Sequence, residues 1–125
     1  MTAAMIPGDV RRFLLATIPT VPHLEALLLL RGRQEDWTLA QLASRLYVDA
    51  ASATALLEDL ATAGLVSAND AGYRYAPAAA DVAGTVDTLS ALYARQTVAV
   101  AELIHSSSDR KAQRFADAFR LRKES

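Results

Sequence analysis

The side chains that could catalyse a reaction or bind a metal ion are few and scattered along this 125-residue chain. His23 and His105 are the only histidines, they lie far apart in the sequence, and no cysteine is present. Glu58 and Asp59 are adjacent, but neighbouring side chains point in different directions on a helix, which excludes a paired-carboxylate acid–base site. No phosphate-binding glycine loop and no nucleophile elbow occurs. We therefore expect no enzyme activity, no cofactor and no metal site; the one metal alternative combines both histidines with Glu25.

Composition favours a helical protein with a real core. Hydrophobic residues make up 52% of the chain, and the formal net charge is −1 with an isoelectric point of about 6.1. Much of the apolar content is alanine, a strong helix former. Dedicated nucleic-acid-binding domains are usually basic, with isoelectric points often above ~9, so the overall charge argues mildly against such a domain.

No segment is predicted to enter a membrane. The longest apolar run, 24–30, contains Glu25 and is far shorter than the ~20 residues that a membrane span needs. The first residues, MTAAMIPGDVRRF, lack the basic start and apolar segment of a signal peptide. Together with the absence of cysteine, this leads us to expect a cytoplasmic protein without a membrane partner.

Capping residues and apolar spacing predict four helices in the first half of the chain. The expected helices cover 10–18, 21–32, 39–47 and 50–63. The residues expected to cap them are Asp9, Thr20, Thr38 and Asp49. The third and fourth helices each show one apolar face, which a core would bury. These faces comprise Leu39, Leu42, Ala43 and Leu46, then Ala53, Leu56, Leu57 and Leu60.

The pattern changes after Gly64, which is a natural helix stop. LVSA (65–68) and YRYA (73–76) alternate with period two around the turn NDAG (69–72), and this predicts a β-hairpin. The fold class expected from this order is mainly α with a small hairpin, followed by a long C-terminal helix and a final short one.

The long helix is expected to run from a cap at Asp81 to about His105, before SSS (106–108) interrupts it and a last helix begins. This helix carries a seam of mostly apolar residues spaced three or four positions apart. We expect this seam to pair two copies of the chain. The alternative is packing against the chain's own helices. The seam comprises Val82, Val86, Leu89, Tyr93, Gln96, Val100 and Leu103. We accordingly divide the chain into 1–80 and a C-terminal extension, 81–125, which we expect to be the dimerisation element.

Residues 38–77 resemble a winged helix–turn–helix domain of the kind found in MarR-like and ArsR-like transcriptional regulators. LAQLASRL corresponds to the first helix, YVDAASAT to the turn and the entry of the second, and LLEDLATAGLV to the exit into the hairpin. The resemblance implies that the second helix lies in the DNA major groove. The DNA contacts it implies are Thr38, Gln41, Arg45, Ser52, Thr54 and Arg74.

Charge divides the chain in a way that leaves a second function open. Residues 38–77 hold two basic and four acidic residues, whereas residues 106–125 hold six basic and three acidic ones. Affinity for DNA depends on neutralising phosphates, so the predicted reading unit lacks the charge it would need. The first hypothesis is a dimeric DNA-binding regulator with double-stranded DNA as its partner. The alternative is a protein–protein interaction module that uses the acidic outer face of the second helix or the basic tail.

Overall fold

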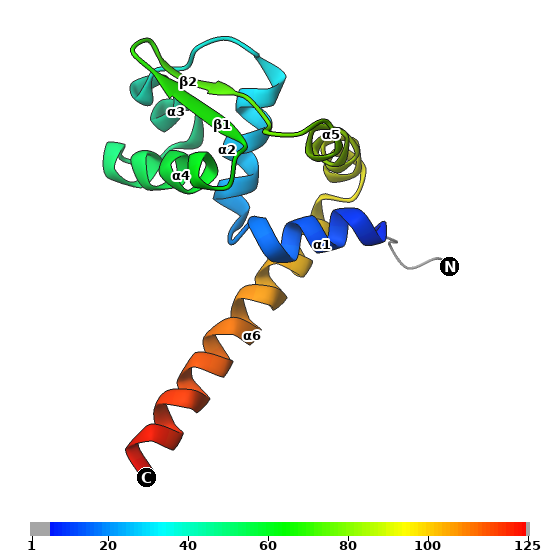
Figure 1. The fold of residues 1–125 in the computed structure, drawn as a ribbon, viewed down its shortest axis with the longest axis vertical. Coiled ribbons are helices and arrows are strands. Elements are labelled where there is room, and N and C mark those ends of the chain that lie inside the picture. The colour runs from blue at the N-terminus through cyan, green and yellow to red at the C-terminus, as the bar shows by residue number, and fades with distance from the viewer. Residues whose placement is uncertain (1–5, 125) are drawn as a thin grey trace.

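The computed structural model describes the backbone of residues 6–124 and the side chains of residues 6–118. The expected class, mainly α with one hairpin, is confirmed (Figure 1). The helices are α1 (Gly8–Thr17), α2 (Val21–Gly32), α3 (Leu39–Leu46), α4 (Ala50–Thr62), α5 (Ala80–Arg95) and α6 (Thr97–Glu124). The hairpin strands, β1 (Val66–Asn69) and β2 (Gly72–Tyr75), lie between α4 and α5.

Two of the four residues predicted to cap helices in the first half of the chain, Thr20 and Asp49, each cap a helix start with a side-chain oxygen. The hydroxyl of Thr20 accepts a hydrogen bond from the backbone N–H of His23, and the carboxylate of Asp49 accepts one from Ser52. Thr38 forms a full capping box, described below. Asp9 is not a cap, because α1 already begins at Gly8 and Asp9 lies in its first turn. Each of the three confirmed caps satisfies a backbone donor that a helix start leaves unpaired.

The predicted cap at Asp81 is also wrong. Helix α5 begins at Ala80 after an extended Ala79, and no side chain caps it. Asp81 instead lies in the first turn, where its charge still suits the positive end of the helix dipole.

The hairpin is held against the entrance of α3. β1 and β2 pair antiparallel, and Trp37 forms an isolated bridge with Tyr73 across the edge of β2. Asn69 directs the turn, since its side-chain oxygen accepts hydrogen bonds from the backbone N–H groups of Ala71 and Gly72. Gly72 has φ +136°, and a Cβ there would lie 2.1 Å from the Trp37 carbonyl oxygen. Only glycine therefore allows the hairpin to approach Trp37 this closely.

One core joins the helices. It contains buried residues of α1, α2, α3, α4, α5 and the first part of α6, together with Trp37 and the start of β1. Val86, Leu89 and Val100 of the expected dimer seam are fully buried in this core. Val82, Tyr93 and Leu103 are partly buried against it. These six side chains therefore pack within one chain, which is the alternative that the sequence left open.

The break between the last two helices lies earlier than expected. α5 ends at Arg95, Gln96 has a non-helical backbone, and α6 then runs without interruption through Ser106–Ser108. The expectation of a break at these serines is wrong, because serine lowers helix propensity only slightly, and this segment contains no glycine or proline. The expected short last helix is thus the second half of α6.

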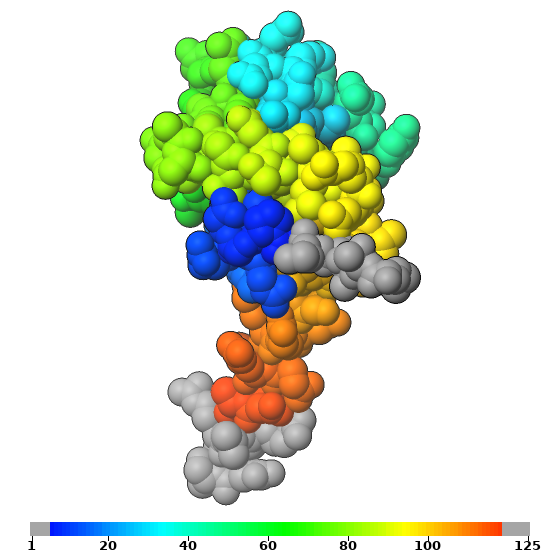
Figure 2. All heavy atoms as spheres, turned by 90° about the vertical axis from the view of Figure 1, so that its right-hand side faces the viewer, coloured from blue at the N-terminus to red at the C-terminus, as the bar shows by residue number. Residues whose placement is uncertain are grey.

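Helix α6 extends well beyond the rest of the molecule (Figures 1 and 2). Val100 and Ile104 in its first turns are buried, whereas every side chain from Ser108 to Ala118 is exposed. Helical spacing predicts that Phe115, Ala118, Phe119 and Arg122 share a face, and the side chains of Phe119 and Arg122 lie outside the described residues.

Candidate functional site

The described residues offer no catalytic or metal-binding constellation. Among the side chains of residues 6–118, no group of three or more histidine or acidic residues could hold a metal ion. No single helix in this range is long and apolar enough to cross a membrane; α1 and α2 reach such a composition only together, and they are bent by 112°. The candidate sites are therefore surfaces.

The first predicted DNA contacts, at the start of α3, are occupied by the fold itself. The backbone N–H of Gln41 donates to the Thr38 hydroxyl at 3.1 Å, and the Gln41 side-chain oxygen accepts from the backbone N–H of Thr38 at 2.9 Å. The same Gln41 oxygen accepts a longer hydrogen bond, 3.4 Å, from Arg33. These two side chains stabilise the helix start, and this use competes with any contact to a phosphate.

The contacts predicted on α4 are likewise engaged locally. Thr54 donates its hydroxyl hydrogen to the carbonyl of Ala50 at 2.9 Å. Hydrogen bonds from the backbone N–H and the hydroxyl of Ser52 lower the pKa of Asp49 below its ordinary value of 3.8. A carboxylate thus stays ionised at the start of α4, where it would face the phosphates of a bound duplex.

The arginines around the hairpin and α2 are paired with acids on separate faces. Arg74 lies 3.3 Å from a carboxylate oxygen of Asp36. Arg31 lies 3.0 Å from Asp87 and also donates to Ser90, which turns it toward α5. These cations neutralise carboxylates of the chain instead of forming one basic surface.

Arg33 and Arg45 both lie near the ring of Trp37. The Arg33 guanidinium lies 4.0 Å from the centre of the indole ring, and that of Arg45 lies 5.8 Å from it, within cation–π range. Trp37 is 2% exposed and donates its indole N–H to the Arg33 carbonyl at 2.9 Å, so it packs at the entrance of α3. Arg33 also lies 3.8 Å from a carboxylate oxygen of Glu35. Of the two arginines predicted to contact DNA, Arg74 has an ion pair and Arg45 has none among the described residues.

A shallow groove continues from Arg45 along α2 and α3. It has a volume of about 450 Å³ and is lined by Glu25, Leu28, Leu29, Arg45, Leu46, Tyr47 and Tyr93. Burial, and then the nearby Glu25 carboxylate, raise the pKa of the Tyr93 hydroxyl. Tyr47, in the turn between α3 and α4, has φ +57° and a side chain that is 95% exposed. A bulky residue in the left-handed region is uncommon, and here its ring is not used to fill the core.

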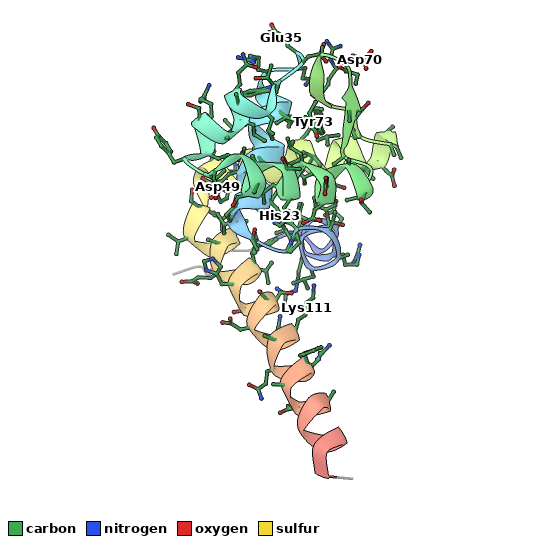
Figure 3. All side chains as sticks on the ribbon, turned by 90° about the vertical axis from the view of Figure 1, so that its left-hand side faces the viewer. His23, Glu35, Asp49, Asp70, Tyr73 and Lys111 are labelled. Atoms are coloured by element: carbon green, nitrogen blue, oxygen red, sulfur yellow. The ribbon has the colours of Figure 1, made fainter. Side chains whose placement is uncertain are left out.

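A buried histidine joins α2 to α4, and sequence reasoning missed it (Figure 3). His23 Nδ1 lies 2.6 Å from the Thr20 hydroxyl, and Nε2 lies 2.8 Å from a carboxylate oxygen of Asp59. The spacing of Thr20 and His23 fits a helix cap, but nothing in the sequence links His23 to a residue 36 positions later. Asp59 is thus partly used in holding α4 against α2.

The outer face of α4 comprises Ala51, Ala55, Glu58 and Thr62, which follow helical spacing and are all exposed. No lysine or arginine occurs between residues 46 and 73, whereas Asp49, Glu58, Asp59 and Asp70 do. Figure 3 also places Asp70 and Glu35 together at the hairpin end of the molecule. Small side chains permit close approach by another surface, and the acids favour a basic one.

The fold therefore positions two unlike surfaces: an acidic face on α4 and the exposed half of α6, which the sequence shows to be basic. Of the predicted DNA contacts, the structure brings together Thr38, Gln41 and Arg45 on α3, while Arg74 lies across the hairpin, paired with Asp36. In comparisons with known proteins, the chain matches no family model, no curated protein and no solved structure.

Proposed function

We propose that this chain is a winged helix–turn–helix domain that acts as a protein–protein interaction module. One observation carries the proposal: Arg31 and Arg74 are paired with the chain's own carboxylates, while the outer face of α4 holds Glu58 and no basic residue. Arg31 is paired with Asp87 and Arg74 with Asp36, so a phosphate would have to compete with a carboxylate of the chain at each of these cations.

Electrostatics decides between a protein and a DNA partner. Contacts to phosphates supply most of the affinity of a DNA-binding domain, and each contact releases condensed counterions. In a groove, the outer face of α4 would bring Glu58 toward phosphates, and no lysine or arginine between residues 46 and 73 would offset its charge. A basic protein surface would instead be attracted by these acids and could approach the small side chains of Ala51 and Ala55 closely.

Binding to DNA tests the proposal directly. We expect the fluorescence anisotropy of a labelled nonspecific duplex to stay unchanged up to tens of micromolar protein at about 50 mM salt, where nonspecific binding is strongest. Arg45→Ala is the informative variant, because Arg45 lies on α3 and has no ion pair among the described residues. A rise in anisotropy that falls steeply with added salt and is reduced by Arg45→Ala would contradict the proposal.

A cytoplasmic, dimeric DNA-binding transcriptional regulator is the second candidate. It is favoured by the order of α3, a short turn, α4 and the hairpin, which matches the arrangement that reads DNA in this fold. The exposed Ser52 and the alanines before it would then approach base edges, and Arg45 would contact a phosphate. The anisotropy measurement above separates this candidate from the first.

A further inference from the structure

The second half of α6 extends from the body of the molecule. In Figures 1 and 2 it leaves the body beyond α1, and its near end lies beside Leu15 of α1, which lines a shallow pocket together with Ser107, Arg110, Lys111 and Arg114. One tether reaches back, from Lys111 Nζ to the Leu15 carbonyl at 3.0 Å. Isolated helices shorter than about 12–15 residues are marginal in water, so this half would gain stability from a partner.

The face of α6 that is buried near the body continues into this free half. Val100 and Ile104 pack in the core, and steps of three or four residues carry the same face through Ser107 to Lys111 and beyond. We define the distal α6 face as Lys111, Arg114, Phe115 and Ala118, which follow i, i+3, i+4 and i+7 spacing and are all exposed. Phe115 is 75% exposed, an unusual position for a phenylalanine that contributes nothing to the core.

The chemistry of the distal α6 face selects the kind of surface that would cover it. Its lysine and arginine would be complemented by acidic side chains on the partner surface, and its aromatic ring would need space between small side chains there. The outer face of α4 has this character: Glu58 lies among Ala51, Ala55 and Thr62, and Asp59 lies beside it with its side chain 60% exposed. Small residues on one helix allow a large side chain on another to pack between them.

In Figure 1, the free half of α6 points away from α4 of the same chain. We propose that the distal α6 face of one copy docks on the outer face of α4 of a second copy, and that the second copy returns the same contact. The result is a closed two-fold dimer. The inference rests on the proposed function, because it uses the outer face of α4 as a protein-docking surface. It adds that the partner is a second copy, that the distal α6 face makes the contact, and that opposite charges attract the two faces.

The expected size of the interface sets its strength. Two reciprocal helix contacts, each about 12 Å long, the length of an eight-residue helical segment, and about 10 Å wide, bury on the order of 500 Å² counting both partners. This lies below the range of stable specific interfaces, so we expect weak association, at about several hundred micromolar protein. Because the attraction is between exposed charges, it should weaken as salt rises.

A charge exchange between Arg114 and Glu58 provides the test. Both side chains are exposed, and neither has an ion pair among the described residues, so reversal should leave the fold intact. At about 50 mM salt, sedimentation velocity should show the mass of the wild-type protein rising from 13.4 kDa toward twice that value with concentration. Arg114→Glu alone and Glu58→Arg alone should each weaken association about tenfold or more, because each places like charges together at both contacts.

Mixing the two variants gives the sharpest result. In a mixed dimer each contact again joins opposite charges, so two proteins that do not associate alone should associate together. Arg95→Glu and Glu102→Arg, which reverse exposed charges elsewhere on α5 and α6, serve as matched controls and should associate like the wild type.

Three outcomes would overturn the inference: a wild-type protein that stays monomeric at several hundred micromolar, variants that associate normally, or a mixture that fails to recover. Binding of duplex DNA that Arg114→Glu abolishes would also overturn it, since the free helix would then serve a nucleic acid. A monomer that binds no DNA would contradict this inference alone, whereas DNA binding through Arg45 would contradict the proposed function.

Discussion

The helical body and the free half of α6 use charged and aromatic residues in opposite ways. In the body, Trp37 is buried with two guanidinium groups near its ring, and Arg31 and Arg74 are paired with carboxylates. In the free half of α6, Phe115 is exposed and Arg114 lies near no carboxylate among the described residues. Trp37, Arg31 and Arg74 thus meet partners within the body, although Arg45 has no ion pair there and Tyr47 is exposed, whereas Arg114 has no ion pair among the described residues and Phe115 is exposed.

This difference teaches where to look for a partner. Paired surface charges contribute little to stability and offer little to a ligand. Unpaired charge beside an exposed aromatic ring is typical of an interface, because aromatic and arginine side chains carry most of the binding energy in such places. The predictions below test this contrast, from the largest expected effect to the smallest.

The tightest point of the body should tolerate no side chain at all. We expect Gly72→Ala to lower the free energy of unfolding by about 4 kcal/mol, since its Cβ would overlap the Trp37 carbonyl and the backbone has φ +136°. Chemical denaturation measures the change. Gly84→Ala, in the exposed interior of α5 with no atom within 4 Å, is the control and should stabilise by about 0.5–1 kcal/mol. Equal effects at both glycines would mean that the hairpin does not approach Trp37.

Truncating large apolar side chains should separate the two regions. Leu57→Ala should destabilise by about 3 kcal/mol, because this fully buried side chain would leave a cavity in the core. Phe115→Ala should change the stability of the monomer by less than about 0.5 kcal/mol, since the ring is 75% exposed. Both values come from denaturation at low micromolar protein, where a weak dimer is dissociated. A large loss with Phe115→Ala under these conditions would place that ring in the monomer core and remove the contrast.

The two histidines should differ in the same direction. His23→Gln should destabilise by about 2 kcal/mol, because it disrupts the buried link between Thr20 and Asp59. His105→Gln, at an exposed position on α6, should have no measurable effect. If the two variants unfold alike, the link between α2 and α4 does not contribute to stability.

The smallest expected effect is a pH dependence at the start of α4. The folded-state pKa of Asp49 is lowered by its hydrogen bonds to Ser52, so the stabilisation is present above the unfolded-state value of 3.8 and is lost as pH falls through the lower folded value. Asp49→Ala should therefore flatten the fall in melting temperature below about pH 4. Asp49→Asn keeps a capping oxygen without the charge, so at neutral pH its melting temperature should lie between those of the wild type and Asp49→Ala. An unchanged acid profile in Asp49→Ala would show that this cap is not formed.

Local signals in the sequence were sufficient for most of the fold. Thr20, Thr38 and Asp49 cap the helices they were expected to cap, since a cap depends only on residues within one turn. The hairpin follows from alternation and from Asn69 in its turn. The helix break was misplaced because Gln96 carries no breaker signal, and its position is set by how α5 and α6 both pack against the core.

The candidate site was less predictable, because it depends on contacts between distant residues. The pairing of Arg31 with Asp87 and of His23 with Asp59 joins segments that only the tertiary fold brings together. The apolar seam of 82–103 was visible in the sequence, but spacing alone does not say whether a seam meets another copy or the same chain. The basic charge at the C-terminus was visible too, although not that the helix bearing it would extend beyond the body.

The most direct test of the central claim, that the outer face of α4 is a protein-docking face, is an intermolecular paramagnetic relaxation measurement. The chain has no cysteine, so Gln113→Cys provides a single site for a nitroxide on the free half of α6. Spin-labelled protein of natural isotope content would be mixed with ¹⁵N-enriched protein that carries no spin label. Only contacts between copies can then broaden the observed amide signals. We predict broadening of the amide signals of Ala51, Ala55 and Glu58, and its loss when the ¹⁵N-enriched copy carries Glu58→Arg. Signals of α4 that stay sharp at several hundred micromolar protein, or broadening confined to other helices, would contradict the claim.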